Sequence, residues 1–239
     1  MSKTILCLVV FFCVATLQAA IVPNTRPNIT FKFGFDECAG GAIVERISGT
    51  YFTMGTAAWV TGRYGCAVQY AGSGTPIKSL SLTSMIFTTY WAHAWIKTTS
   101  TDNSWHAIFS GGGGGIGIPG LNSSTYGRIG SWEYDGGWGA NYSTVRVDDK
   151  KWHMVDIIKK TDKYVTIYID GVFNVRMTTG KTLTSSTGFQ IGGQDTYWMF
   201  NGLIDDAFYV HLPTDAQQPS ATEIKQIYEN YKNSGLFSD

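Results

Sequence analysis

Residues 164–177 read YVTIYIDGVFNVRM, and this stretch decides the fold class. Apolar and polar side chains alternate along 164–169 and again along 172–177, which is typical of half-buried β-strands. Asp170-Gly171 lies between the two runs, and this dipeptide is a strong signal of a tight β-hairpin. The stretch therefore predicts a pair of antiparallel strands.

Comparable runs occur on both sides of this hairpin. The sequence predicts further strands at 29–35, 66–70, 80–87, 91–96, 152–158, 189–192 and 203–210. The five glycines at 111–115 have no side chains to anchor a core, so they predict a loop or a strand edge with close backbone approach. Residues 132–138, which follow, predict an aromatic turn.

One helix is predicted, close to the C-terminal end. Ser220 and Glu223 form a capping-box pattern, and Ile224, Ile227 and Tyr231 then repeat at helical spacing. The composition, with 28 Gly, 13 Tyr and 8 Trp, otherwise favours turns and strands. The chain is therefore predicted to be all-β with a short C-terminal helix.

The first twenty residues are predicted to be a secretory signal peptide. Lys3 precedes an apolar run over 5–17, and small residues Ala19 and Ala20 end it. A signal anchor is the alternative, although the run is shorter than the ~20 residues that a membrane span needs. Residues 21–239 are then expected to form one secreted, extracellular domain with no membrane span.

The cysteine content fits the predicted secretion. Cys7 and Cys13 fall in the signal peptide, which leaves Cys38 and Cys66. A single pair in a secreted chain predicts a disulfide, with two free thiols or a metal pair as alternatives.

Two other patterns bear on the partner. Asn28, Asn122 and Asn141 each begin an Asn-x-Ser/Thr sequon, so the protein is predicted to be a glycoprotein. The 18 basic and 18 acidic residues balance and form no basic stripe, which argues against nucleic acid.

As a set, four stretches resemble the laminin-G-like jelly rolls of the concanavalin A-like lectin/glucanase superfamily. They are 33–37 (FGFDE), 59–70 (WVTGRYGCAVQY), 151–155 (KWHMV) continuing to 168–171 (YIDG), and 200–206 (FNGLIDD). The resemblance implies a two-sheet antiparallel jelly-roll sandwich. The fold alone does not fix an activity, since it hosts unrelated ones.

The resemblance also implies a structural calcium ion. Members of the superfamily often hold one between the first strand and the Ile-Asp-Asp strand, where Asp36 and Asp205 match, and calcium takes oxygen ligands. Alternatively, these acids cap turns or pair with Arg63 or Lys32.

The aromatic turn is the predicted ligand site. Trp132, Tyr134 and Trp138 offer flat faces for sugar rings, while Asp135 and Asn141 offer groups for sugar hydroxyls. The alternatives are that the tryptophans fill the core beneath a loop or contact a protein.

The same residues permit an enzyme hypothesis, which the sequence does not favour. Glucanases of this fold place acids in the pattern Glu-x-Asp-x-x-Glu, because alternate residues of a strand share a face. Glu133 and Asp135 match the first two places, but Trp138 occupies the third, so the pattern is incomplete.

We therefore expect a recognition module for an extracellular glycan or glycoprotein, without catalysis. A structural or matrix-assembly module is the alternative, and a glycoside hydrolase is the third hypothesis.

Overall fold

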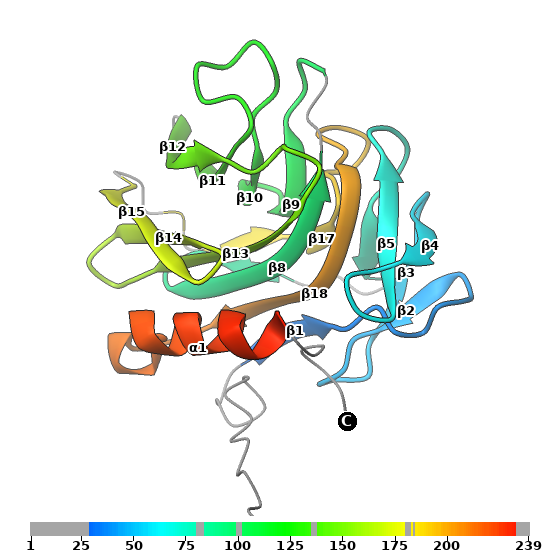
Figure 1. The fold of residues 1–239 in the computed structure, drawn as a ribbon, viewed down its shortest axis with the longest axis horizontal. Helices are drawn as coiled ribbons and strands as arrows, with labels where there is room; N and C mark the ends of the chain where they lie inside the picture. Colours follow the sequence, from blue (N-terminus) through cyan, green and yellow to red (C-terminus); the bar gives the residue numbers. More distant parts are fainter. Residues whose placement is uncertain are drawn as a thin grey trace, which may run out of the picture.

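The computed structural model describes residues 29–79, 84–98, 102–134, 138–179, 183 and 185–232. The predicted signal peptide, the Asn28 sequon and Asp135 lie outside these residues. Figure 1 shows two strand layers with one helix, α1, across the outer side of one layer. The predicted all-β, two-sheet jelly-roll sandwich is thus confirmed.

The first layer, sheet A, is antiparallel and contains the predicted hairpin at one edge. Its strand order is β15 (Val172–Thr178), β14 (Tyr164–Ile169), β13 (Trp152–Lys159), β8 (Tyr90–Thr98), β18 (Asn201–His211), β5 (Cys66–Ala71) and β4 (Ala58–Thr61), and β1 (Ile29–Phe33) also pairs with β18. In the hairpin turn, Asp170 and Gly171 have φ of 52° and 76°, the left-handed conformation that Asp-Gly turns favour.

The second layer, sheet B, faces sheet A. Its order is β12 (Trp138–Arg146), β11 (Arg128–Tyr134), β10 (Gly114–Ile118), β9 (His106–Gly111), β17 (Gln190–Ile191), β6 (Ile77–Ser79), β3 (Tyr51–Thr53) and β2 (Ala42–Val44). A separate pair joins β7 (Ser84–Ile86) to β16 (Ser185–Thr187). The glycine run is therefore not a loop, because most of it belongs to the paired strands β9 and β10.

The helix begins as the sequence predicts. In α1 (Ala221–Tyr231), the Ser220 hydroxyl accepts from the backbone N–H of Glu223, and the Glu223 carboxylate accepts from that of Ser220. A 3-10 helix, η2 (Asp215–Gln217), precedes it. The buried side of α1 packs on the outer face of sheet A in a cluster that includes Trp91, Trp95, Met154, Phe208, Ile224, Ile227 and Tyr231.

The main core fills the space between the sheets. The Phe31 and Phe189 rings stack with centroids 4.2 Å apart, and Phe33 meets Phe52 edge-to-face at 5.0 Å. These phenylalanines come from β1, β3 and the segment before β17, so their burial joins the two layers. No helix in the described part of the chain is long and apolar enough to cross a membrane.

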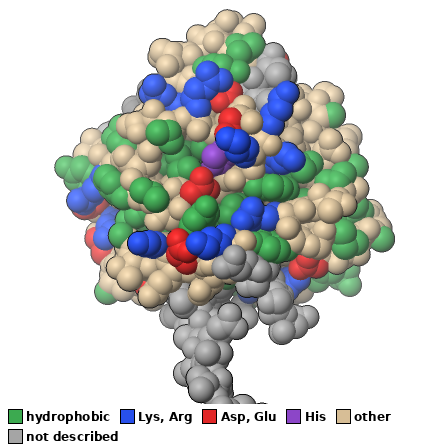
Figure 2. Space-filling view, in the orientation of Figure 1, with side chains coloured by type: hydrophobic (Ala, Val, Ile, Leu, Met, Phe, Trp, Pro, Cys, Tyr) green, Lys and Arg blue, Asp and Glu red, His purple; other side chains and the backbone are tan. Residues whose placement is uncertain are grey.

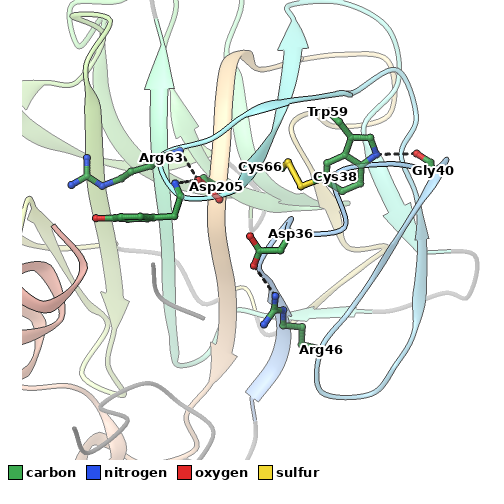
Figure 3. The surroundings of a disulfide bond; sticks show 9 residues. Asp36, Cys38, Gly40, Arg46, Trp59, Arg63, Cys66 and Asp205 are labelled. Atoms are coloured by element: carbon green, nitrogen blue, oxygen red, sulfur yellow. Dashed lines mark hydrogen bonds and ion pairs between the residues drawn. A yellow bond between two sulfur atoms is a disulfide. The ribbon is translucent and has the colours of Figure 1, made fainter. Parts of the chain in front are cut away.

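The predicted disulfide is confirmed. Cys38, in the loop after β1, is bonded to Cys66 at the start of β5, with their Cα atoms 5.4 Å apart. Nearby, the Trp59 indole N–H donates to the carbonyl of Gly40 at 2.9 Å, so the same loop is attached to β4 as well (Figure 3).

Candidate functional site

A pocket of about 290 Å³ opens on the outer face of sheet B, and its lining is almost wholly aromatic. Three indoles and one phenol surround it, together with a methyl group: Trp105, Trp132, Trp198, Tyr142 and Ala140. The ring centroids of Trp105 and Trp132 lie 5.1 Å apart, and those of Trp132 and Trp198 lie 5.6 Å apart at 88°. We call these residues the aromatic pocket.

The strand register explains how the pocket is built. Ala140 pairs with Trp132 across β11 and β12, and Tyr142 pairs with Gly130, so all four positions share the outer face. A Cβ atom on Gly115 of β10 would lie 2.4 Å from the Trp132 ring, and one on Gly130 would lie 2.6 Å from Tyr142. Glycine at these positions lets the two rings lie directly on the sheet.

The remaining walls come from two segments that meet at one end of the sandwich. Trp105 immediately precedes β9, and Trp198 lies in the segment that leads into β18. The backbone N–H of Ala107 donates to the carbonyl of Trp198 at 2.7 Å, which holds these segments together. Trp198 also has a left-handed φ of 51°, so the backbone turns sharply at this residue.

One of the lining residues, Trp132, is almost fully buried. Trp132 is 2 % exposed, and its indole N–H has no hydrogen-bond acceptor in the part of the chain that the structure describes. Trp105, Tyr142 and Trp198 are half-buried, so their ring faces remain accessible. The arrangement therefore offers aromatic stacking surfaces, which suit a ligand with apolar faces.

The predicted ligand residues are only partly brought together. Trp132 lines the pocket as a buried wall, while Tyr134, at the end of β11, is 48 % exposed and is not part of the lining. Trp138 begins β12 opposite Tyr134, and Asp135 lies outside the described residues. Trp105 and Trp198 were missed because they lie far from the predicted aromatic turn in the sequence, and Tyr142 was missed although it follows Trp138 by four residues.

Asn141 requires a correction. It lies between Ala140 and Tyr142 in β12, so its side chain points away from the pocket and is only 4 % exposed. That burial counts against both roles predicted for it, as a sugar-binding residue and as a glycan acceptor. Asn122 is exposed in the loop between β10 and β11, where a glycan could be attached.

Glu133, the first acid of the incomplete glucanase pattern, faces the interior. Lys159 of β13 donates to both carboxylate oxygens of Glu133 at 2.7 Å, and the two side chains are 2 % and 1 % exposed. Burial lowers the pKa of Lys159, and the Glu133 carboxylate opposes that shift. Glu133 thus joins the two sheets and does not reach the outer face where the aromatic pocket opens.

The predicted calcium ligands do approach one another, at the loop between β4 and β5 (Figure 3). A Cβ atom on Gly65 would lie 2.7 Å from Asp36 Oδ1, and one on Gly62 would lie 2.6 Å from Asp205 Oδ2. Burial raises the pKa of the Asp205 carboxyl to about 7, and the nearby Asp36 adds to the rise. Two acids that meet at a glycine loop fit as two of the oxygen ligands of a calcium ion.

Both carboxylates also have protein partners. Asp205 accepts from the backbone N–H of Arg63 at 2.8 Å, and Asp36 accepts from the Arg46 guanidinium at 2.8 Å. Within the described ranges, no group of three or more His, Cys, Asp or Glu side chains could hold a metal ion. Calcium would need carbonyl or water oxygens in addition and would compete with Arg46, so it stays a prediction.

The two-sheet sandwich is a lectin-like jelly roll. Residues 71–211, more than half of the chain, match the family described as the concanavalin A-like lectin/glucanases superfamily, and the chain belongs to that family. No curated protein sequence matches it.

Solved structures of binding domains share the fold. The binding domain of Paraclostridial Mosquitocidal Protein 1 is 15% identical, with a TM-score of 0.62 over 85% of this chain and 52% of that one. Domain 4 of AbnA, a GH43 extracellular arabinanase from Geobacillus stearothermophilus, was solved with arabinotriose and is 16% identical, with a TM-score of 0.61 over 83% of this chain and 97% of that one.

The ligand-binding domain of botulinum neurotoxin serotype D, solved with N-acetylneuraminic acid, is 16% identical, with a TM-score of 0.62 over 85% of this chain and 51% of that one. This chain therefore spans about half the length of the toxin domains that it matches. At these identities the similarity establishes the fold alone.

Proposed function

We propose that this protein is a secreted glycan-recognition module and that the aromatic pocket is its sugar-binding site. The observation that carries the proposal is the grouping of Trp105, Trp132 and Trp198 around one opening. Sugar rings have apolar faces that stack on indoles. The volume of about 290 Å³ lies at the lower end of ligand pockets, which favours one terminal sugar unit.

Two further considerations support recognition without catalysis. A retaining glycosidase needs two carboxyl groups about 5 Å apart on either side of the scissile bond. The described lining of the aromatic pocket contains no acid, and Glu133 is engaged by Lys159 between the sheets. The structural neighbours include domains solved with arabinotriose and with N-acetylneuraminic acid, which is consistent with a glycan as partner.

The test is a glycan array followed by titration calorimetry on the best-bound sugar. Trp105→Ala and Trp198→Ala should each weaken binding by about 1–3 kcal/mol, because each removes a stacking face. Tyr51→Ala is the matched control, since Tyr51 is 61 % exposed on β3 and lies outside the pocket. Both pocket variants remove half-buried rings, so near-ultraviolet circular dichroism can establish that they remain folded.

Three results would count against this proposal. Normal binding by both folded tryptophan variants would place the recognition surface elsewhere. Release of reducing ends from β-glucans would make the protein an enzyme.

The third result is an array without bound glycans, together with self-association that rises with concentration. It would favour the structural or matrix-assembly module. The specific observation behind that second candidate is the edge strand β15, where Val172 is 65 % exposed and Phe173 is 54 % exposed. An exposed sheet edge with apolar side chains can pair with another chain.

A further inference from the structure

A second pocket, of about 310 Å³, opens on the outer face of sheet A, and its lining mixes apolar, polar and basic residues. It includes Gln69, Tyr70, Lys97, Thr98, Lys150, Asn201, Gly202 and Leu203. Leu203 pairs with Gln69 on one side and with Lys97 on the other, so these three lie side by side across β5, β18 and β8. Their neighbours Val68, Ile96 and Ile204 belong to the core, which places the three on the face away from sheet B. We call this the lysine pocket.

The charge in this pocket is not neutralised by the protein. No ion pair within the described residues includes Lys97 or Lys150, and no acid is among the lining residues. The acid next in sequence, Asp149, is engaged by Lys151 at 3.1 Å and by His153 at 3.0 Å. Figure 2 shows several Lys and Arg side chains, with Asp or Glu side chains among them, over the upper half of the face on which β8 and β18 lie in Figure 1.

The backbone brings the two lysines to one place. Lys150 has a left-handed φ of 68°, which is uncommon for a lysine, and its N–H donates to the carbonyl of Thr98 at 3.1 Å. This bond ties the turn before β13 to the end of β8, one residue after Lys97. Gly202 has a φ of 145°, and a Cβ atom there would lie 2.3 Å from the carbonyl oxygen of Lys97. Only glycine therefore fits at position 202, beside Lys97. The Thr98 hydroxyl donates to the carbonyl of Asn201, which holds β8 and β18 together at this point.

We infer that the lysine pocket binds the anionic group of an acidic sugar, either a carboxylate or a sulfate. Two ammonium groups without carboxylate partners can each form a charge-assisted hydrogen bond with such a group. The amide of Gln69, on the same face, is suited to the neutral hydroxyls of the sugar ring. This site lies on the sheet opposite the aromatic pocket, and it neither uses nor requires the stacking surfaces proposed there.

The experiment compares four probes by titration calorimetry at physiological salt. A chondroitin sulfate hexasaccharide carries sulfate and uronate, a hyaluronan hexasaccharide carries uronate alone, sialyllactose carries a sialic acid carboxylate, and lactose is neutral. We expect at least one acidic probe to bind, with an affinity that falls as salt rises, whereas lactose should not bind at the lysine pocket. The pattern over the first three probes identifies the anionic group.

The variants are chosen to keep the backbone intact. Lys97→Gln preserves the strand, and Lys150→Asn places at the left-handed position a residue that tolerates it. Each should weaken acidic-probe binding about tenfold, the equivalent of one charge-assisted hydrogen bond. Lys225→Gln, on the exposed side of α1, removes the same charge outside the pocket and should leave binding unchanged.

Two outcomes would overturn the inference: acidic probes that bind no better than lactose, or a Lys225→Gln variant that loses as much affinity as the pocket variants. Trp105→Ala separates this test from that of the aromatic pocket. It should leave binding of the acidic group unchanged, so one site can fail while the other stands.

Discussion

Replacing Glu133 by glutamine should destabilise the fold. Glu133 follows Trp132 of the aromatic pocket in the sequence, but its side chain lies between the two sheets. The carboxylate is 1 % exposed and accepts two hydrogen bonds from Lys159, each at 2.7 Å. Glutamine retains the shape but not the charge, so the ammonium of Lys159 would be left between the sheets without a counterion.

The magnitude follows from that burial. Removing one partner of a buried ion pair costs about 3–5 kcal/mol, and we expect about 3 kcal/mol here because the glutamine oxygen can still accept one hydrogen bond. The free energy of unfolding of a domain is about 5–15 kcal/mol, so the expected loss is a large share of its stability. Urea denaturation followed by tryptophan fluorescence measures it directly.

Two further measurements make the argument specific to charge. The double variant Glu133→Gln, Lys159→Met should regain much of the lost stability, because it removes the unpaired ammonium as well. The deficit of Glu133→Gln should also shrink as the pH rises toward ~10, since a buried lysine with a lowered pKa costs least where it is neutral. If Glu133→Gln lowers the free energy of unfolding by less than about 1 kcal/mol, or if the double variant recovers no stability, the Glu133–Lys159 ion pair does not stabilise the packing of the two sheets.

Two other predictions concern metal and pH. Calcium should raise the Tm by binding at Asp36 and Asp205, and Asp205→Ala should abolish that rise. If metal-stripped protein has the same Tm with and without calcium, the predicted calcium site does not exist. The hydrogen bond to Asp170 at 2.8 Å, with help from Asp149, raises the pKa of His153 against the opposing effect of burial. The resulting stabilisation should be complete below about pH 6.5, and it should be lost as the pH rises through the higher pKa that His153 has in the folded protein. Urea denaturation at several pH values measures this dependence, and His153→Gln should flatten it.

The parts of the fold that were predictable are those with a local cause. The hairpin of β14 and β15 follows from alternation and from the turn at Asp170-Gly171, and the start of α1 follows from Ser220 and Glu223. Each signal lies within a few residues of the structure that it produces. The short strands β2, β3 and β6 gave no comparable signal, because strands of three residues are specified by the neighbours with which they pair rather than by their own alternation.

The candidate sites were less predictable for the same reason. Trp132 could be singled out beside its glycines, but Trp105 and Trp198 reach it only after the segments before β9 and β18 have come together. The lysine pocket likewise joins Lys97 to Lys150 through a backbone bond between two segments. Neither assembly has a spacing in the sequence that would reveal it.

One sequence signal for the aromatic pocket was nevertheless present. The glycine run indicated missing side chains, and from that we expected a loop or a strand edge with close backbone approach. The close approach is found, but it lies within β10, which has a paired strand on both sides. In a paired strand, however, a missing side chain leaves a space that a large ring from the next strand can occupy, as Trp132 does over Gly115. Glycine and tryptophan in adjacent strands can therefore place a ring flat on the sheet, as Trp132 does in the lining of the aromatic pocket.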